Sequence, residues 1–419
     1  MGSLLSTNAA ESALPHDPSA MEYLEKNLLH NTDPNAMVSV PVVTENSKKD
    51  LNFPKVELHL HLDGSVRFST LLELSLAKGT PLKGAKTVEE LKKVLITHEP
   101  ANLSKVLEAF DLLLPVVRGD KAAIERIAYE MCEDQAANGV IYFEARYSPQ
   151  LLVAPGGELT STGVVEAIKR GFDRGEADFG VKARSIVCCI RGLHQYVNDV
   201  LRIATECRHL GVVAVDVAGS AHGADEQYER EVVVMFQQAF KRGIHRTVHA
   251  GESGGAKEVV KVYFLNSSQE YKGLLLSYLQ HAKSCSVQAI NDMHAERIGH
   301  GYRVMQQPDM YKKYFLDDQR IHLEACPYSS VMTGAVPLDW KKHPIASWAK
   351  DNVNFSISRD DPTCFDNTML SELQLAKDEI GLTPHQLWQC QLNAARSCFL
   401  TETEKKPIIE KILAAEPKQ

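Results

Sequence analysis

Four histidines and a pair of aspartates follow short apolar runs of this chain, each near the carboxyl end of its run. Histidine and carboxylate groups gathered at one place can bind a borderline divalent ion, and a set without thiols favours zinc. The segments are Val56-Glu-Leu-His59-Leu-His61-Leu-Asp63-Gly64, Thr247-Val-His249-Ala-Gly-Glu252, Ile298-Gly-His300-Gly-Tyr302 and Ser356-Ile-Ser-Arg-Asp360-Asp361-Pro362.

The first of these segments alternates polar and apolar residues. Side chains point to opposite faces of a strand in turn, so His59, His61 and Asp63 share one face, while three leucines share the other. Two imidazoles about 6–7 Å apart along a strand can converge on one metal ion. A catalytic zinc keeps one position open for water and lowers the pKa of that water to about 7. Glu252, His300 and Asp361 are then the candidates for proton transfer and substrate orientation.

Eight apolar runs, separated by amphipathic segments, must position these groups. Strands that alternate with helices indicate parallel βαβ units, and eight units predict a (β/α)₈ TIM barrel, whose active sites lie at the carboxyl ends of the strands. On pattern alone an open, doubly wound sheet is the alternative. The expected strands are Val56–Leu62, Val140–Tyr147, Ala183–Ile190, Val212–Ala218, Arg246–Ala250, Arg297–Gly299, Ile321–Ala325 and Asn354–Ser358.

Additional helices are expected around and after these runs. Segments such as 121–138, 163–174 and 226–242 have a helical pattern, and further helices are predicted between Asn367 and Ala415. Residues 1–50 are expected to form a poorly ordered or surface-wrapping extension to a single barrel domain at 51–419. His245 lies four residues before His249, which is about 13 Å along a strand, so we expect it at the opposite end of the barrel and outside the site.

These segments together resemble the adenosine deaminase family (the adenosine/AMP deaminases of the amidohydrolase superfamily). The chain also resembles that family in Phe143-Glu-Ala-Arg-Tyr-Ser-Pro149, Val215-Asp-Val-Ala-Gly219 and Cys326-Pro-Tyr-Ser-Ser-Val-Met-Thr-Gly334, and the similarity runs from about Phe53 to about Leu400. The resemblance implies zinc-dependent hydrolytic deamination of adenosine and 2′-deoxyadenosine to inosine and 2′-deoxyinosine, with release of ammonia, in purine metabolism.

The resemblance also assigns roles to residues. It implies one Zn²⁺ per chain, held by His59, His61, His249 and Asp360. His300 would orient the attacking water and take its proton, and Glu252 would protonate N1 of the purine. Asp361 would share a proton with N7, the Gly219 N–H would meet N3, and Asp63 would bond the ribose hydroxyl. Leu103, Leu107 and Phe110 would form an apolar wall, although their spacing also fits the core face of a helix.

The chain departs from the family pattern at three places. His249 and His300 are 51 residues apart, a long interval, so residues 263–287 are interpreted as an insertion. Ser358 and Arg359 stand where the family usually has Asn and Thr. After Gly219, the segment 220–223 lacks the usual acidic pair.

Composition excludes several classes of protein. A net charge of −8 and a pI near 6.1 disfavour nucleic-acid binding, and no apolar run is long enough to span a membrane. Nine cysteines form no C-x-x-C pair, and residues 1–20 show no secretory signal, so a cytoplasmic location is expected. Met1-Gly2-Ser3-Leu4-Leu5-Ser6 fits the N-myristoylation pattern at Gly2, but so short a pattern often arises by chance, and an unmodified start is favoured. The expected partner is a small purine nucleoside, and no protein partner is predicted.

Three alternatives stay open from the sequence. A deaminase of AMP or N6-alkylated AMP would need cations for the phosphate, which Arg67, Arg118, Lys257 or Arg359 could supply. A two-metal amidohydrolase is disfavoured because Val212–Gly219 contains no lysine. Cytidine-type deaminases are disfavoured because no P-C-x-x-C accompanies either H-x-E triplet. The third alternative is a homologue that binds or signals and has reduced catalytic activity.

Overall fold

The structure is a computed structural model that describes residues 38–220, 228–252, 285–317 and 321–417. Gly2, Lys257 and residues 263–284 of the predicted insertion therefore lie outside the described residues. Among the described helices, none is both long enough and apolar enough to cross a membrane.

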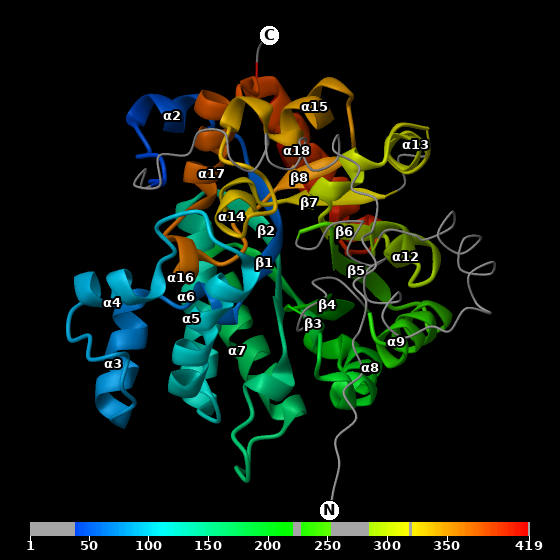
Figure 1. The fold of residues 1–419 in the computed structure, drawn as a ribbon. Helices are drawn as coiled ribbons and strands as arrows, with labels where there is room; N and C mark the ends of the chain where they lie inside the picture. Colours follow the sequence, from blue (N-terminus) through cyan, green and yellow to red (C-terminus); the bar gives the residue numbers. More distant parts are fainter. Residues whose placement is uncertain (1–37, 221–227, 253–284, 318–320, 418–419) are drawn as a thin grey trace, which may run out of the picture. The chain divides into compact units, whose positions relative to one another are not determined.

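Eight parallel strands form one sheet whose order in space is their order in sequence (Figure 1). The sheet closes through Asp360, which follows the last strand: its N–H donates to His59 O at 3.2 Å, and the His61 N–H donates to Asp360 O at 3.0 Å. This is the predicted (β/α)₈ barrel, and the open doubly wound sheet is excluded. The strands are β1 (Lys55–His61), β2 (Val140–Tyr147), β3 (Lys182–Ile190), β4 (Val212–Ala218), β5 (His245–Ala250), β6 (Arg297–His300), β7 (His322–Ala325) and β8 (Phe355–Ile357).

Helices follow the strands and extend beyond the last of them, as the sequence predicts. Short 3₁₀ turns and two π-helical turns, Lys312–Asp317 and Ala376–Ile380, connect some of them. The helices are α2 (Glu45–Asp50), α3 (Phe68–Lys78), α4 (Val88–Leu95), α5 (Leu103–Val117), α6 (Lys121–Ala137), α7 (Ser161–Phe179), α8 (Val197–Glu206), α9 (Arg230–Lys241), α12 (Cys285–Asn291), α13 (Pro308–Tyr311), α14 (Pro327–Met332), α15 (Pro344–Lys350), α16 (Pro362–Phe365), α17 (Met369–Leu375), α18 (Pro384–Ser397) and α19 (Glu402–Leu413).

Side-chain caps fix where several helices begin. The Asn102 side chain accepts the Lys105 N–H and starts α5, the helix that carries the predicted apolar wall. At α19 the Thr401 hydroxyl accepts the Glu404 N–H while the Glu404 carboxylate accepts the Thr401 N–H, which is a capping box. Such caps satisfy N–H groups that have no partner inside the helix.

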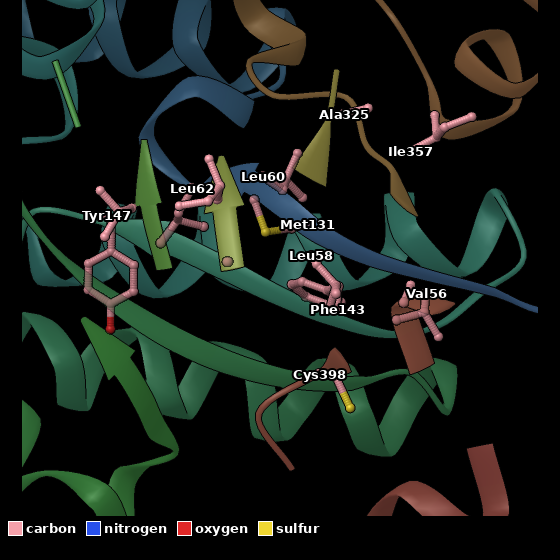
Figure 2. Close-up of a cluster of buried hydrophobic side chains, with 14 of the residues drawn as sticks. Val56, Leu58, Leu60, Leu62, Met131, Phe143, Tyr147, Ala325, Ile357 and Cys398 are labelled. Carbon is pink, nitrogen blue, oxygen red and sulfur yellow. The ribbon is translucent and has the colours of Figure 1, made fainter. Parts of the chain in front are cut away.

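The alternation in β1 separates the core from the site. Val56, Leu58, Leu60 and Leu62 are fully buried in an apolar cluster that includes Met131 of α6 (Figure 2). The intervening residues of β1 belong to the opposite face of the strand. One strand thus anchors the sheet to its helices and presents histidines to the barrel interior.

The described part of the predicted N-terminal extension, residues 38–50, contacts the rest of the chain. The Tyr328 hydroxyl donates to Val38 O at 2.9 Å, and the Gln374 side chain donates to Val42 O at 3.0 Å. The boundary at residue 50 stays a prediction.

Buried His322 makes stability depend on pH. Burial lowers the pKa of His322 to about 4, so its imidazole stays neutral in the folded chain near pH 5. In the unfolded chain the same imidazole becomes protonated below about pH 6.5. When a basic group has a lower pKa in the folded chain than in the unfolded chain, the folded chain loses stability as the pH falls. Between pH 7 and pH 5 this group should reduce the free energy of unfolding by about 2 kcal/mol. Denaturant unfolding of the chain and of His322→Gln at both pH values tests this: the variant should lose less stability, and equal losses would contradict the assignment.

Candidate metal and nucleoside site

Three imidazoles and one carboxylate converge at the carboxyl ends of β1, β5 and β8. Asp360 Oδ1 lies 3.2 Å from His59 Nε2 and 3.4 Å from His61 Nε2. His61 Nε2 is 3.3 Å from His249 Nε2. The structure therefore brings together the four groups that the family resemblance proposes as ligands. His300 lies next to them, with its Nε2 3.9 Å from Asp360 Oδ2.

The hydrogen-bond partners of two of these histidines indicate that the cluster suits a cation. His59 Nδ1 lies 2.8 Å from a Glu324 oxygen, and His249 Nδ1 lies 2.9 Å from an Asp216 oxygen. A carboxylate beside Nδ1 favours the tautomer with its proton there, and in the neutral ring this leaves the lone pair on Nε2, toward the other proposed ligands. His59 Nε2 is buried without a hydrogen-bond partner, and a cation among these atoms would satisfy it. The donor set fits a metal ion, and its nitrogen and oxygen atoms suit zinc.

One buried guanidinium joins the two orienting carboxylates. Arg146 donates to Asp216 at 2.9 Å and to Glu324 at 2.7 Å, and also to the carbonyl of Leu58 in β1. Burial alone would raise the pKa of Glu324, but Arg146 and Arg297 hold that pKa well below its usual range. Both carboxylates are fully buried, so each needs such a partner to remain ionised.

The backbone is strained at two site residues. Asp360 has φ +70° and His300 has φ +66°, left-handed conformations that residues other than glycine seldom adopt. At Asp360 this turn lets the backbone bond β1 on one side while the carboxylate faces the histidines. The Ser329 hydroxyl donates to Asp360 Oδ2 at 2.7 Å and fixes the second oxygen.

A cavity of about 230 Å³ opens beside this cluster. Its lining includes every predicted site residue except His59, which is fully buried beneath it. The predicted site residues in the lining are His61, Asp63, Leu103, Leu107, Phe110, Gly219, His249, Glu252, His300, Asp360 and Asp361. Among the described residues no lysine or arginine lines the cavity, whereas Asp111 adds a further carboxylate.

Burial controls the protonation of the carboxyl groups in the cavity. Burial, together with the nearby charges of Asp360, Asp63 and Glu252, raises the pKa of Asp361 well above its ordinary value. Burial likewise raises the pKa of Asp63 to about 7. Glu252 Oε2 lies 3.4 Å from His300 Nε2, within reach for sharing one proton through a small movement. The site therefore contains carboxyl groups that can donate a hydrogen bond near neutral pH.

Two glycines are needed because other groups approach them closely. A Cβ on Gly64 would lie 1.8 Å from Asp361 Oδ1, and a Cβ on Gly299 would lie 2.8 Å from the His59 ring. Any side chain at either position would displace a site residue.

Sequence reasoning missed the groups that orient the ligands: Asp216, Glu324, Arg146 and Ser329. A signal for Asp216 is present, because it is a charged residue inside the otherwise apolar strand β4. The control residue His245 begins β5, where it pairs with Glu296, far along the strand from His249.

Comparison with known proteins gives consistent matches. A family model described as "Adenosine deaminase" matches residues 54–265 and 281–415, and the unmatched stretch falls within the predicted insertion. An adenosine deaminase from Danio rerio is 37% identical over 380 residues, which cover 88% of this chain and 97% of that protein.

Two solved structures share the fold. An Arabidopsis N6-mAMP deaminase matches with a TM-score of 0.69 at 24% identity, covering 88% of this chain and 99% of that one. An adenine deaminase from Arthrobacter aurescens matches with a TM-score of 0.70 at 21% identity, covering 86% of this chain and 98% of that one.

Loss of an orienting carboxylate should weaken metal binding. Glu324→Gln removes the charge beside His59 Nδ1, and such outer partners typically contribute about 10–100-fold in metal affinity. Glu144→Gln is the matched control, since Glu144 pairs with Arg297 of the same buried network but with none of the four ligand groups. Zinc affinity from chelator competition should fall for Glu324→Gln only. Equal affinities in the two variants would show that Glu324 does not orient His59.

Proposed function

We propose a residue-level mechanism on the premise, carried by the family match, that this chain belongs to the adenosine deaminase family and is a hydrolase that deaminates adenosine. The observation that supports the mechanism best is the convergence of His59, His61, His249 and Asp360 beside a cavity that also contains Glu252 and His300. The same cavity would accept 2′-deoxyadenosine.

In this proposal His59, His61, His249 and Asp360 hold one zinc ion per chain. Zinc bound there would supply an acidified water as the nucleophile for C6 of the purine. His300 also offers a ligand atom close to those of His59, His249 and Asp360. The family resemblance gives it a different role, and its Nε2 lies 3.4 Å from Glu252 Oε2. We assign it to orient the attacking water and to accept its proton as the bond to C6 forms. Return of that proton to the amino group would let the C6–N bond break and ammonia leave.

The carboxyl groups orient and activate the purine ring. Glu252 protonates N1, so that C6 becomes electrophilic and no uncompensated negative charge builds up on the ring. The raised pKa of Asp361 supports a protonated carboxyl that donates a hydrogen bond to N7. The Gly219 N–H donates to N3, and Asp63 bonds the ribose hydroxyl. Leu103, Leu107 and Phe110 of α5 would then cover the ring and exclude water.

The charge of the cavity favours a nucleoside over a nucleotide. Arg359 is buried and pairs with Glu57 at 2.9 Å, and Arg67 pairs with Glu133 and Asp134. Arg118 donates to the Leu151 carbonyl. None of these three candidate phosphate ligands lines the cavity, and Lys257 lies outside the described residues.

We also propose, from the sequence, a cytoplasmic location, an extension at residues 1–50 before a single barrel domain at 51–419, and an insertion at 263–287.

Glu252→Gln should abolish most activity while metal binding is retained. Glutamine keeps the size of the side chain but cannot protonate N1, and general acid catalysis typically contributes about 10²–10⁴-fold in rate. We expect kcat for adenosine, followed by ultraviolet absorbance, to fall by that range at full zinc occupancy. Asp111→Asn, which neutralises another carboxylate of the lining, is the control and should keep kcat within about twofold. Near-normal turnover of Glu252→Gln would refute the role of Glu252.

Adenosine should be preferred over AMP. The cavity lining offers carboxylates and no described cation, and burying an unpaired charge costs several kcal/mol, so kcat/KM for adenosine should exceed that for AMP by at least about 100-fold. Parallel assays with adenosine, AMP and N6-methyl-AMP measure the ratio. A preference for either nucleotide would contradict the proposal.

A further inference from the structure

The barrel has a seam between β4 and β5. Their registered pairs are Ala214 with His245 and Val215 with Arg246, all in the half of the strands away from the site. By contrast, β5 stays registered with β6 up to Ala250 and His300. Beyond these pairs, side chains connect the two strands. Asp216 of β4 lies 2.9 Å from His249 Nδ1 of β5, and a second side chain links the Gly219 end of β4 to the backbone of His249.

Arg191 makes that connection. It follows β3, its own N–H donates to Ala218 O at 3.0 Å, and its side chain is buried. One terminal nitrogen of the guanidinium donates to Gly219 O at 2.5 Å, and the other donates to His249 O at 2.6 Å. A single planar group thus bridges the two strand ends across the seam.

Tyr228 supports the same arrangement. Its hydroxyl donates to His249 O at 2.8 Å, and its ring centroid lies 5.3 Å from the Arg191 guanidinium carbon. The neighbouring Glu229 accepts the Gly192 N–H at 2.6 Å. The segment before α9 is therefore tied to the end of β3, and the His249 carbonyl accepts two side-chain donors.

Glycine suits position 219 on the other side of the bridge. Its φ is +84°, and a Cβ there would lie only 3.0 Å from the Ile190 side chain at the end of β3. A shift of the bridge would move the Gly219 peptide, its hydrogen-bonding group included.

We infer that Arg191 is a positioning residue for the deamination site, which sets the distance between the His249 end of β5 and the Gly219 end of β4. This inference rests on the proposed roles of His249 as a metal ligand and Gly219 as the purine contact. The planar guanidinium of arginine holds two N–H donors at a fixed separation, so it sets the distance between the two carbonyl acceptors. The lysine ammonium has a single nitrogen and cannot do this. A misplacement of about 1 Å at such positions can cost about 100-fold in rate.

Arg191→Lys and Arg191→Gln test the bridge, with Arg184→Gln as the matched control. Arg184 also lies on β3, but at the end away from the site, where it pairs with Glu404 at 3.1 Å. For each variant we would measure kcat and KM for adenosine, zinc affinity by chelator competition, and Tm. Both Arg191 variants should raise KM and weaken zinc binding at least about tenfold at temperatures well below Tm. Arg184→Gln should leave KM and zinc affinity within about twofold even if Tm falls.

The outcome is decisive in each case. Wild-type KM and zinc affinity in Arg191→Lys, or a lower Tm as the sole effect in both Arg191 variants, would overturn the inference. If the Arg191 variants do not fold, Tyr228→Phe decides: it removes one donor to His249 O and should change KM and zinc affinity in the same direction, whereas no change would overturn the bridge. Failure of the proposed ligand set is recognised separately, because His61→Ala would then retain zinc at full occupancy.

Discussion

The constraint on which the site depends is that Glu324 and Asp216 orient two buried imidazoles from behind. Each carboxylate lies beside the Nδ1 atom of its histidine, His59 or His249, which leaves Nε2 facing the other proposed ligands. This arrangement prepares the Nε2 atoms to bind a cation. Metal binding and the orientation of the ligands are therefore two results of the same buried hydrogen bonds.

Closure of the barrel and assembly of the site are also linked. Asp360 bonds β1 through its backbone and faces the histidines with its carboxylate, in a left-handed conformation that the surrounding bonds maintain. Arg146 connects the carboxylates behind two ligands from different strands. Because isolated buried charges are costly, loss of any one member of this network would destabilise the others.

The fold could be predicted from the sequence because strand and helix periods are local patterns, whereas the roles of the site residues rest on the family resemblance and stay predictions. The runs at 140–147 and 212–218 match the observed strands at both ends, and the histidines of β1 were placed together by simple alternation. The orienting groups were missed since their partners come from other strands, and the pairing of Arg146 with Glu324 depends on distances that no local pattern contains. Likewise, the short register between β4 and β5 and the bridge by Arg191 follow from barrel packing.

Zinc K-edge X-ray absorption on the zinc-loaded chain tests the central claim most directly, because it reports the ligand atoms of the ion. Four protein ligands are expected: three imidazole nitrogens and one carboxylate oxygen at about 2.0–2.2 Å, with a further light atom from water. A sulfur ligand at about 2.3 Å, or fewer than three imidazoles, would contradict the account.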